Sequence, residues 1–203
     1  MKNKYHILVA ILLFLVAGCS MLAERPESEG QNYYTVLERW TGSAKVYKGV
    51  DVILDVEVVY MGREFKTAYV EEYAARLGMD EDRKKRMLER ELEKLDEYNE
   101  LILVAATPVE EWNDFESRRS IWRLYLVDED GESVEPLEIK RLDRDAFLRE
   151  FFPFVDEWST VYRVTFPRLT PKGHTIGEGS QYIRLKISGI KGSTELLWNL
   201  KEQ

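Results

Sequence analysis

Four stretches of this chain alternate apolar and polar residues with a period of two, and this pattern constrains the fold most. In the first stretch, Val52, Val56 and Tyr60 fall on one side, because successive side chains of a strand point to opposite faces. Bulky apolar side chains on one face only are typical of a strand with one buried side. The four stretches are residues 51–60, 121–127, 158–166 and 181–188. Further strands are predicted at 43–47, 101–106, 134–139 and 194–200.

The pattern changes to helical spacing once, between the second and third of these strands. Apolar residues recur every three or four positions over 66–77, and Gly78 is a plausible helix stop. A second helix is predicted to begin after Asp80, a good N-cap, and to run to about Tyr98. We expect its apolar stripe to pack on the domain's own sheet, and binding of another protein is the alternative. The stripe consists of Leu88, Leu92, Leu95 and Tyr98.

Residue types that carry catalysis or bind metals are scarce in this chain. It has one cysteine, Cys19, and two histidines, His6 and His174. A zinc site needs several Cys or His ligands, and a serine triad would need a partnered histidine. His174 lies in a Gly- and Pro-containing stretch typical of a surface loop. Residues 128–132 superficially resemble a calcium loop, but their Asp-Gly pair predicts a hairpin turn. We therefore predict no catalytic residue, no metal site and no cofactor.

The N-terminus has the three regions of an export signal. Lys2 and Lys4 precede an apolar run over 7–16, and Val16-Ala17-Gly18-Cys19 follows. The run is shorter than the roughly 20 residues of a membrane span, which disfavours the alternative of an uncleaved signal anchor.

This segment resembles the lipobox of bacterial lipoproteins. The resemblance implies that 1–18 is a signal peptide, that Cys19 is acylated after cleavage, and that 19–32 is a lipidated tether. It also implies attachment to a membrane through the lipid on Cys19. Because Ser20 rather than Asp follows the cysteine, the expected location is the outer membrane, facing the periplasm.

Acidic residues outnumber basic ones. Loss of 1–18 removes Lys2 and Lys4, so that 29 basic residues become 27 against 37 acidic residues, a net charge of about −10. Nucleic-acid binding needs clustered Lys and Arg, so we expect no nucleic acid as a partner. The same balance disfavours electrostatic adhesion to anionic lipid.

The mature chain is predicted to form a single β-sandwich domain over 33–203, with a helical insertion at about 66–98. The C-terminal half, about residues 100–200, resembles an immunoglobulin-type β-sandwich in its strand endings Tyr-x-Val-x-Phe-Pro and Leu-Leu-Trp-Asn-Leu. It lacks the Cys-Trp-Cys signature of true immunoglobulin domains. The chain also resembles uncharacterised bacterial lipoproteins, which imply no activity.

Three functions remain open. The first is a lipid-anchored, non-catalytic cell-envelope protein that acts as a binding or assembly module, with an envelope protein as partner. We expect its contacts at the helical hairpin and at the loop 167–180. The second is a carrier or sensor of a small apolar ligand held between sheet and helices. The third is a hydrolase that uses two carboxylates, although the sequence does not identify a pair. The rings proposed to line the ligand pocket are Tyr69, Tyr73, Phe151, Phe152 and Trp158.

Overall fold

The computed structural model describes residues 32–177 and 179–201. Contacts divide the chain into Met1–Asn32 and Tyr33–Gln203, and the described helices and strands lie in the second unit. The helices are α2 (Tyr33–Trp40), α3 (Arg63–Leu77), α4 (Glu81–Glu97) and α5 (Ala146–Phe151), with a 3-10 turn at Glu110–Trp112. The strands are β1 (Thr41–Lys48), β2 (Asp51–Tyr60), β3 (Tyr98–Ala106), β4 (Trp122–Val127), β5 (Ser133–Val134), β6 (Glu138–Leu142), β7 (Thr160–Pro167), β8 (Tyr182–Gly189) and β9 (Gly192–Asn199).

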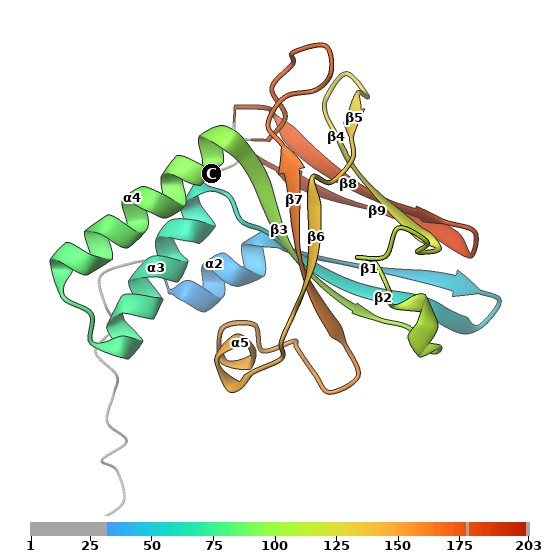
Figure 1. The fold of residues 1–203 in the computed structure, drawn as a ribbon, viewed down its shortest axis with the longest axis horizontal. Helices are drawn as coiled ribbons and strands as arrows, with labels where there is room; N and C mark the ends of the chain where they lie inside the picture. The colour runs from blue at the N-terminus through green and yellow to red at the C-terminus, as the bar shows by residue number, and fades with distance from the viewer. Residues whose placement is uncertain (1–31, 178, 202–203) are drawn as a thin grey trace, which may run out of the picture. The chain divides into compact units, whose positions relative to one another are not determined.

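These strands form two antiparallel sheets that face each other (Figure 1). One sheet has five strands in the order β1-β2-β3-β7-β6, and the other has four in the order β5-β4-β8-β9. The fold is therefore mainly β and sandwich-like, as the alternating pattern predicts. Its immunoglobulin-like character stays a prediction.

The five-stranded sheet is covered on both faces. Val58 pairs with Leu103, and Gly42 on the same face would carry its Cβ 2.9 Å from Leu196 of the other sheet. This face is therefore the interior of the sandwich. Glu100 points to the opposite face, where its carboxylate meets Lys66 of α3. The helices α2, α3 and α5 lie on that side (Figure 1), so the sheet is the middle layer of three.

The helical hairpin follows the predicted signals. Gly78 adopts the left-handed conformation with φ 59° and ends α3, and the side chain of Asp80 accepts a hydrogen bond from the Arg83 N–H at the start of α4. Leu95 of the predicted stripe is buried, while Leu88 and Leu92 are half-buried where α4 packs on α3. The stripe thus packs within the domain, mainly against another helix rather than the sheet.

The predicted strand at 134–139 is wrong as a single strand. The structure has two, because β5 ends at Val134 in the four-stranded sheet and β6 begins at Glu138 in the five-stranded sheet. Pro136 lies between them and has no N–H to donate to a ladder, so the chain leaves one sheet there and joins the other.

Two other elements differ from expectation. The helix α2 was not predicted; it buries Tyr33, Val36, Leu37 and Trp40. The strand expected at 158–166 begins only at Thr160, and Trp158 is 77% exposed. The reason is local, because the carboxylate of Asp156 accepts the N–H groups of Trp158 and Ser159 and holds the chain in a turn.

Candidate binding surface

The four-stranded sheet buries one face and leaves the other bare. Leu124, Leu185 and Leu196 point to the core and are at most 5% exposed, so the residues between them point outward. Within residues 32–177 and 179–201, no helix packs extensively on β4, β8 or β9, and Figure 1 shows the helical layer beyond the five-stranded sheet. The outward positions are Arg123, Tyr125 and Val127 on β4, Tyr182, Arg184, Lys186 and Ser188 on β8, and Ser193, Glu195, Leu197 and Asn199 on β9.

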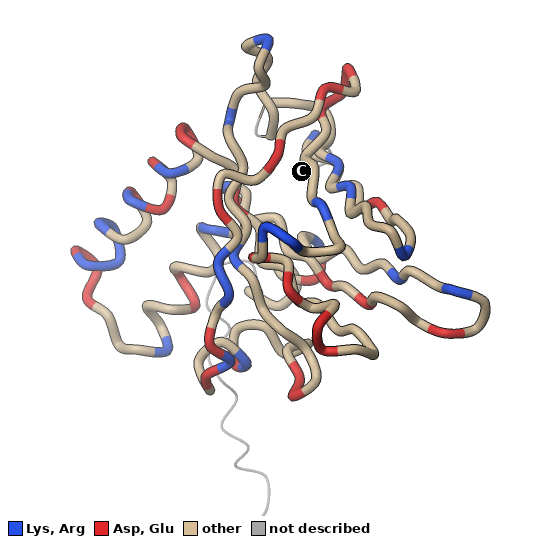
Figure 2. The backbone as a smooth tube through the Cα atoms, turned by 45° about the vertical axis from the view of Figure 1, so that its right-hand side comes forward, with Lys and Arg blue, Asp and Glu red and all other residues tan. Residues whose placement is uncertain are grey.

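This face is basic although the chain carries a net charge of −8. Glu195 is its one outward acidic residue among the described strand positions, and Glu129 lies at its end beside Tyr182. Figure 2 shows Lys and Arg recurring along these strands and the adjoining loops. We call this surface the basic face; its cations on the strands are Arg123, Arg184 and Lys186, and Arg119 lies at its end in the loop before β4.

Arg123 is fixed by backbone carbonyls. Its guanidinium donates to the carbonyl oxygens of Ser120 at 2.7 Å, Trp122 at 2.9 Å and Arg118 at 3.2 Å. These acceptors are neutral, so they orient the guanidinium without cancelling its charge. Arg123 is therefore a preorganised cation at the end of the face.

Arg184 and Lys191 each lie beside an aromatic ring. The guanidinium of Arg184 is 5.8 Å from the ring centre of Tyr182, and its Nε is 3.7 Å from a carboxylate oxygen of Glu195. The ammonium of Lys191 lies 4.2 Å from the ring centre of Trp112. A ring contact holds a cation in place but leaves it charged, whereas the carboxylate of Glu195 offsets part of the charge of Arg184. Lys191 lies in the turn between β8 and β9, and the face itself carries Arg123, Arg184 and Lys186.

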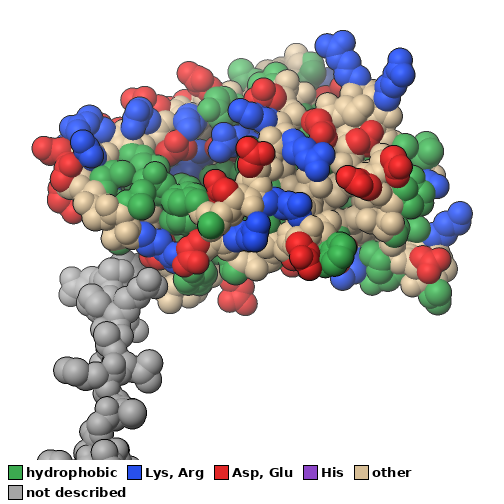
Figure 3. Space-filling model, turned by 60° about the horizontal axis from the view of Figure 1, so that its bottom comes forward, with side chains coloured by type: hydrophobic (Ala, Val, Ile, Leu, Met, Phe, Trp, Pro, Cys, Tyr) green, Lys and Arg blue, Asp and Glu red, His purple; other side chains and the backbone are tan. Residues whose placement is uncertain are grey.

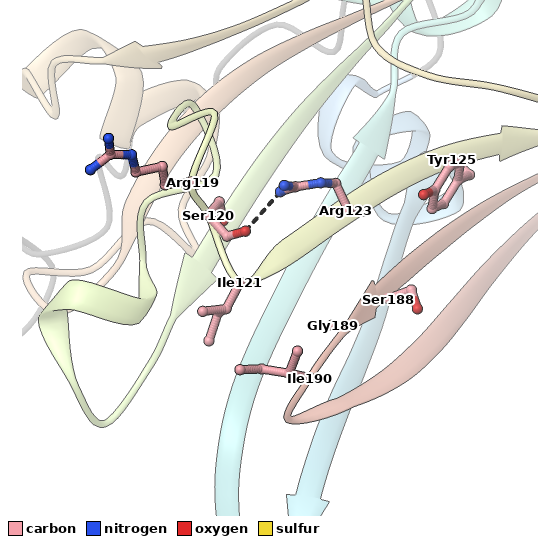
Figure 4. Close-up of a pocket in the computed structure, with 8 residues that line it drawn as sticks. All are labelled: Arg119, Ser120, Ile121, Arg123, Tyr125, Ser188, Gly189 and Ile190. Carbon is pink, nitrogen blue, oxygen red and sulfur yellow. Dashed lines mark hydrogen bonds between the residues drawn. The ribbon is translucent and has the colours of Figure 1, made fainter.

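A shallow cleft of about 440 Å3 opens at the end of the basic face. Gly189 lines it, and no larger residue fits there, because a Cβ would lie 2.5 Å from both the carbonyl oxygen of Ile121 and the ring of Trp122. Figure 4 shows Arg123 turned toward Ser120, with Ile121 and Ile190 together at the other side. The lining residues are Arg119, Ser120, Ile121, Arg123, Tyr125, Ser188, Gly189 and Ile190. Guanidinium and hydroxyl groups around an open cleft suit recognition of an anion.

A second polar cluster lies between α3 and the five-stranded sheet. The ammonium of Lys66, 1% exposed, donates to Glu100 at 2.8 Å and to Glu91 at 2.9 Å, and Arg163 lies 3.0 Å from Glu100. Burial opposes the charge of Lys66, but the two carboxylates outweigh it and raise its pKa. Because each of these buried charges has an opposite partner, we assign the cluster to stability rather than to chemistry.

Four of the five rings proposed for a ligand pocket do come together. Tyr69 lies 4.9 Å from Phe151 and 6.1 Å from Tyr73 between ring centres, and Phe152 stacks on Phe65 in the same layer. Burial raises the pKa of Tyr69 to about 12. Trp158 lies apart, in the exposed turn described above. The space-filling view in Figure 3 shows hydrophobic side chains gathered over this helical layer. The rings pack on one another, as in a core.

The acidic residues after β4 form the predicted hairpin turn. One carboxylate oxygen of Asp128 accepts the N–H groups of Asp130 at 3.0 Å and Glu132 at 2.7 Å. Glu132 pairs with Lys172, whose hydrogen bond lowers the pKa of the carboxyl group. His174 is exposed, as predicted, and its Nδ1 lies 3.7 Å from Asp130. Asp128, Glu132 and His174 offer ligand atoms within 4.8 Å of one another, but the turn and the ion pair already engage both carboxylates.

Cys19, the one residue to which the sequence assigns a modification, lies outside the described residues, as does the whole signal segment 1–18. Over the part of the chain that is described, no helix has both the length and the apolar character to cross a membrane. The basic face was missed because whole-chain charge conceals it. The available signal was the polar phase of the alternation, which contains Arg123, Arg184 and Lys186.

Comparisons with known proteins give little more. No protein-family model matches the chain, and no curated protein matches it. Among solved structures, the chain is similar to a protein of unknown function from Burkholderia pseudomallei, solved at 1.90 Å resolution. The two share 13% identity and a TM-score of 0.38, over 81% of this chain and 80% of that chain.

Proposed function

We propose that this chain is a lipid-anchored, non-catalytic cell-envelope protein, acting as a binding module whose contact surface is the basic face. The proposal of a lipid anchor rests on the position of Cys19, the chain's single cysteine, directly after a short apolar run and Ala17-Gly18. Two or three acyl chains on that cysteine give stable attachment, whereas one alone binds reversibly. Ser20 supports the outer membrane, facing the periplasm, as the location.

The arrangement of the domain supports presentation of the basic face to a partner. The chain enters the domain at Tyr33, whose ring packs with Phe65 and Phe151 in the helical layer. The basic face lies on the other side of the five-stranded sheet (Figure 1). A domain tethered through its helical side can turn the basic face away from its point of attachment.

We propose the basic face as the contact surface in place of the helical hairpin and the loop 167–180, which the sequence suggested. The stripe of α4 packs on α3 within the domain. The loop 168–177 is attached to β3 through Asn99, whose amide donates to the carbonyl oxygen of Ile176 at 2.9 Å. Among the described residues, no helix packs extensively on the strands of the basic face. The carrier function stays a prediction without a specific observation in its favour, and the proposal does not depend on an immunoglobulin-like ancestry.

Metabolic labelling with an alkyne analogue of palmitate tests the anchor. The wild-type chain incorporates the label and partitions with detergent, whereas Cys19→Ala does neither, because no other thiol is present. Ser20→Ala is the matched control and keeps both properties. Equal labelling of the wild type and Cys19→Ala would show that Cys19 is not the anchor.

A further inference from the structure

The cations of the basic face form a row rather than a single pocket. Arg184 and Lys186 are two residues apart on β8, which separates their outward side chains by about 7 Å. Arg123 on the neighbouring strand pairs with Ser188, the next outward position of β8. The row therefore continues with the same step along the sheet and ends at the cleft. Glu195 lies opposite Lys186 and 3.7 Å from Arg184, so it offsets one of the three positive charges and the row keeps a net positive charge. Such a row matches a ligand that repeats its negative charges.

Hydroxyl groups lie between these cations. Ser188 pairs with Ser193 across β8 and β9, and Tyr125 lies opposite Lys186. Serine and tyrosine hydroxyls both donate and accept hydrogen bonds, as a sugar ring requires, while Arg and Lys only donate. The basic face thus offers ion pairing and hydroxyl recognition side by side.

The basic face differs from a surface that inserts into lipid. An amphipathic membrane-bound surface buries an apolar face in the lipid. Here the strongly exposed aliphatic side chains are Leu197 at 60% and Ile190 at 84%, and Ile190 lies at the turn beyond the strands. Val127 and Leu197 lie on either side of Arg184, and charged, polar or tyrosine side chains occupy the other outward positions of the strands.

We infer that the basic face binds an anionic polysaccharide, a glycan with carboxylate groups repeated along its length. The inference rests on the proposed function only in taking the basic face as the contact surface. Several weak ion pairs on one polymer add up, because each further contact forms at high effective concentration. The binding is electrostatic, so it weakens as salt screens the charges.

The test measures binding of polygalacturonate to the full chain, purified in non-ionic detergent, with dextran as the neutral polymer. We expect binding of polygalacturonate at about 0.05 M salt and its loss at about 0.5 M. The double variant Arg184→Gln, Lys186→Gln raises the Kd by about tenfold. Its matched control is Lys85→Gln, Arg86→Gln on α4, which removes the same charge and leaves the Kd unchanged. Equal urea midpoints for both double variants show that each is folded.

Three results overturn the inference: no binding of polygalacturonate, equal binding of dextran, or an equal loss in the α4 control. The lipid arm is glycerophosphoglycerol, the soluble headgroup of phosphatidylglycerol, because vesicles would dissolve in the detergent and would also bind through the acylated Cys19. If this headgroup binds and polygalacturonate does not, the basic face recognises a lipid headgroup instead. Because the assay is in detergent, it does not depend on the anchor. Loss of label in Cys19→Ala and loss of polymer binding are therefore separate failures.

Discussion

The two sheets of this domain contrast in what covers them. The five-stranded sheet lies between the helices and the other sheet, and its strand β3 is buried over seven consecutive residues. The four-stranded sheet has one covered face, and its strand β4 alternates buried Leu124 and Leu126 with more exposed Arg123 and Tyr125. A sheet buried on both faces cannot meet a partner without unpacking, whereas a bare face can. The contrast therefore indicates where recognition is possible.

The charges follow the same division. Glu100 of the covered sheet is 6% exposed and has cations on both carboxylate oxygens, Lys66 on one and Arg163 on the other. On the bare sheet, Arg184 and Lys186 lie in solvent with Glu195 as their neighbour across the strands. Removing a charge should therefore cost stability in the covered sheet and cost binding in the bare one.

Lys66→Ala gives the largest expected effect on stability. It leaves Glu100 buried with one cation instead of two, and Glu91 without its buried partner, so the free energy of unfolding falls by about 3–5 kcal/mol. The matched variant on the bare sheet, Lys186→Ala, changes it by less than about 0.5 kcal/mol. Urea unfolding measures both. A loss below about 1 kcal/mol for Lys66→Ala would mean that the covered sheet does not depend on this cluster.

Leucine-to-alanine variants compare the two sheets through residues that carry no charge. Leu103 is fully buried in the sandwich interior, and Leu103→Ala lowers the free energy of unfolding by about 2–5 kcal/mol through lost burial and a cavity. Leu197→Ala on the bare face stays within about 0.5 kcal/mol. Thermal unfolding monitored by circular dichroism compares the pair. Similar losses for both leucines contradict the assignment of covered and bare faces.

Asn99→Ala tests the attachment of the loop after β7 to the covered sheet. The side-chain oxygen of Asn99 accepts a hydrogen bond from the Tyr60 hydroxyl at 3.1 Å, and its amide nitrogen donates to the carbonyl oxygens of Ile176 at 2.9 Å and Pro167 at 3.3 Å. Loss of these three bonds lowers the free energy of unfolding by about 1–3 kcal/mol and speeds amide exchange over 168–177. Hydrogen exchange with mass spectrometry measures the local effect. Unchanged exchange in the loop shows that other contacts hold it.

Acid titration has the smallest expected effect. Burial opposes the charge of Glu91, but hydrogen bonds from Lys94 and Lys66 outweigh it and hold the pKa of Glu91 below its usual value. Ionised Glu91 therefore stabilises the fold above its unfolded-state pKa, and this contribution disappears as the pH falls through the folded-state value. Glu91→Gln should lose less stability than the wild type between neutral and acid pH. Parallel curves of unfolding free energy against pH for the wild type and Glu91→Gln would show that Glu91 does not contribute to the pH dependence.

Local patterns predicted much of the fold. Alternation identified most strands, and Gly78 and Asp80 marked the ends of two helices, because those conformations depend on neighbouring residues. The helix α2 was missed despite apolar Tyr33, Val36 and Trp40 at helical spacing. It has eight residues and directly follows a polar stretch, and its stability comes from packing that sequence does not show.

The candidate surface depends on contacts between distant residues. The alternation places Arg123 and Lys186 on the polar sides of their own strands, but only the pairing of β4 with β8 makes them neighbours. Net charge averages over the molecule, so the acidic total led to the expectation that anionic surfaces are unfavourable partners. Segregation of charge between faces is a property of the folded domain.

Lysine acetylation in intact envelopes, compared with acetylation of the detergent-purified chain, tests whether the basic face is the contact surface. Lys186 lies on the basic face, and Lys85 is an exposed lysine of α4 that serves as the internal control. If the basic face is the contact surface, Lys186 reacts several-fold more slowly in envelopes, while Lys85 reacts at the same rate in both samples. Equal rates for Lys186 in the two samples, or protection of Lys85 alone, would contradict the role of the basic face as the contact surface.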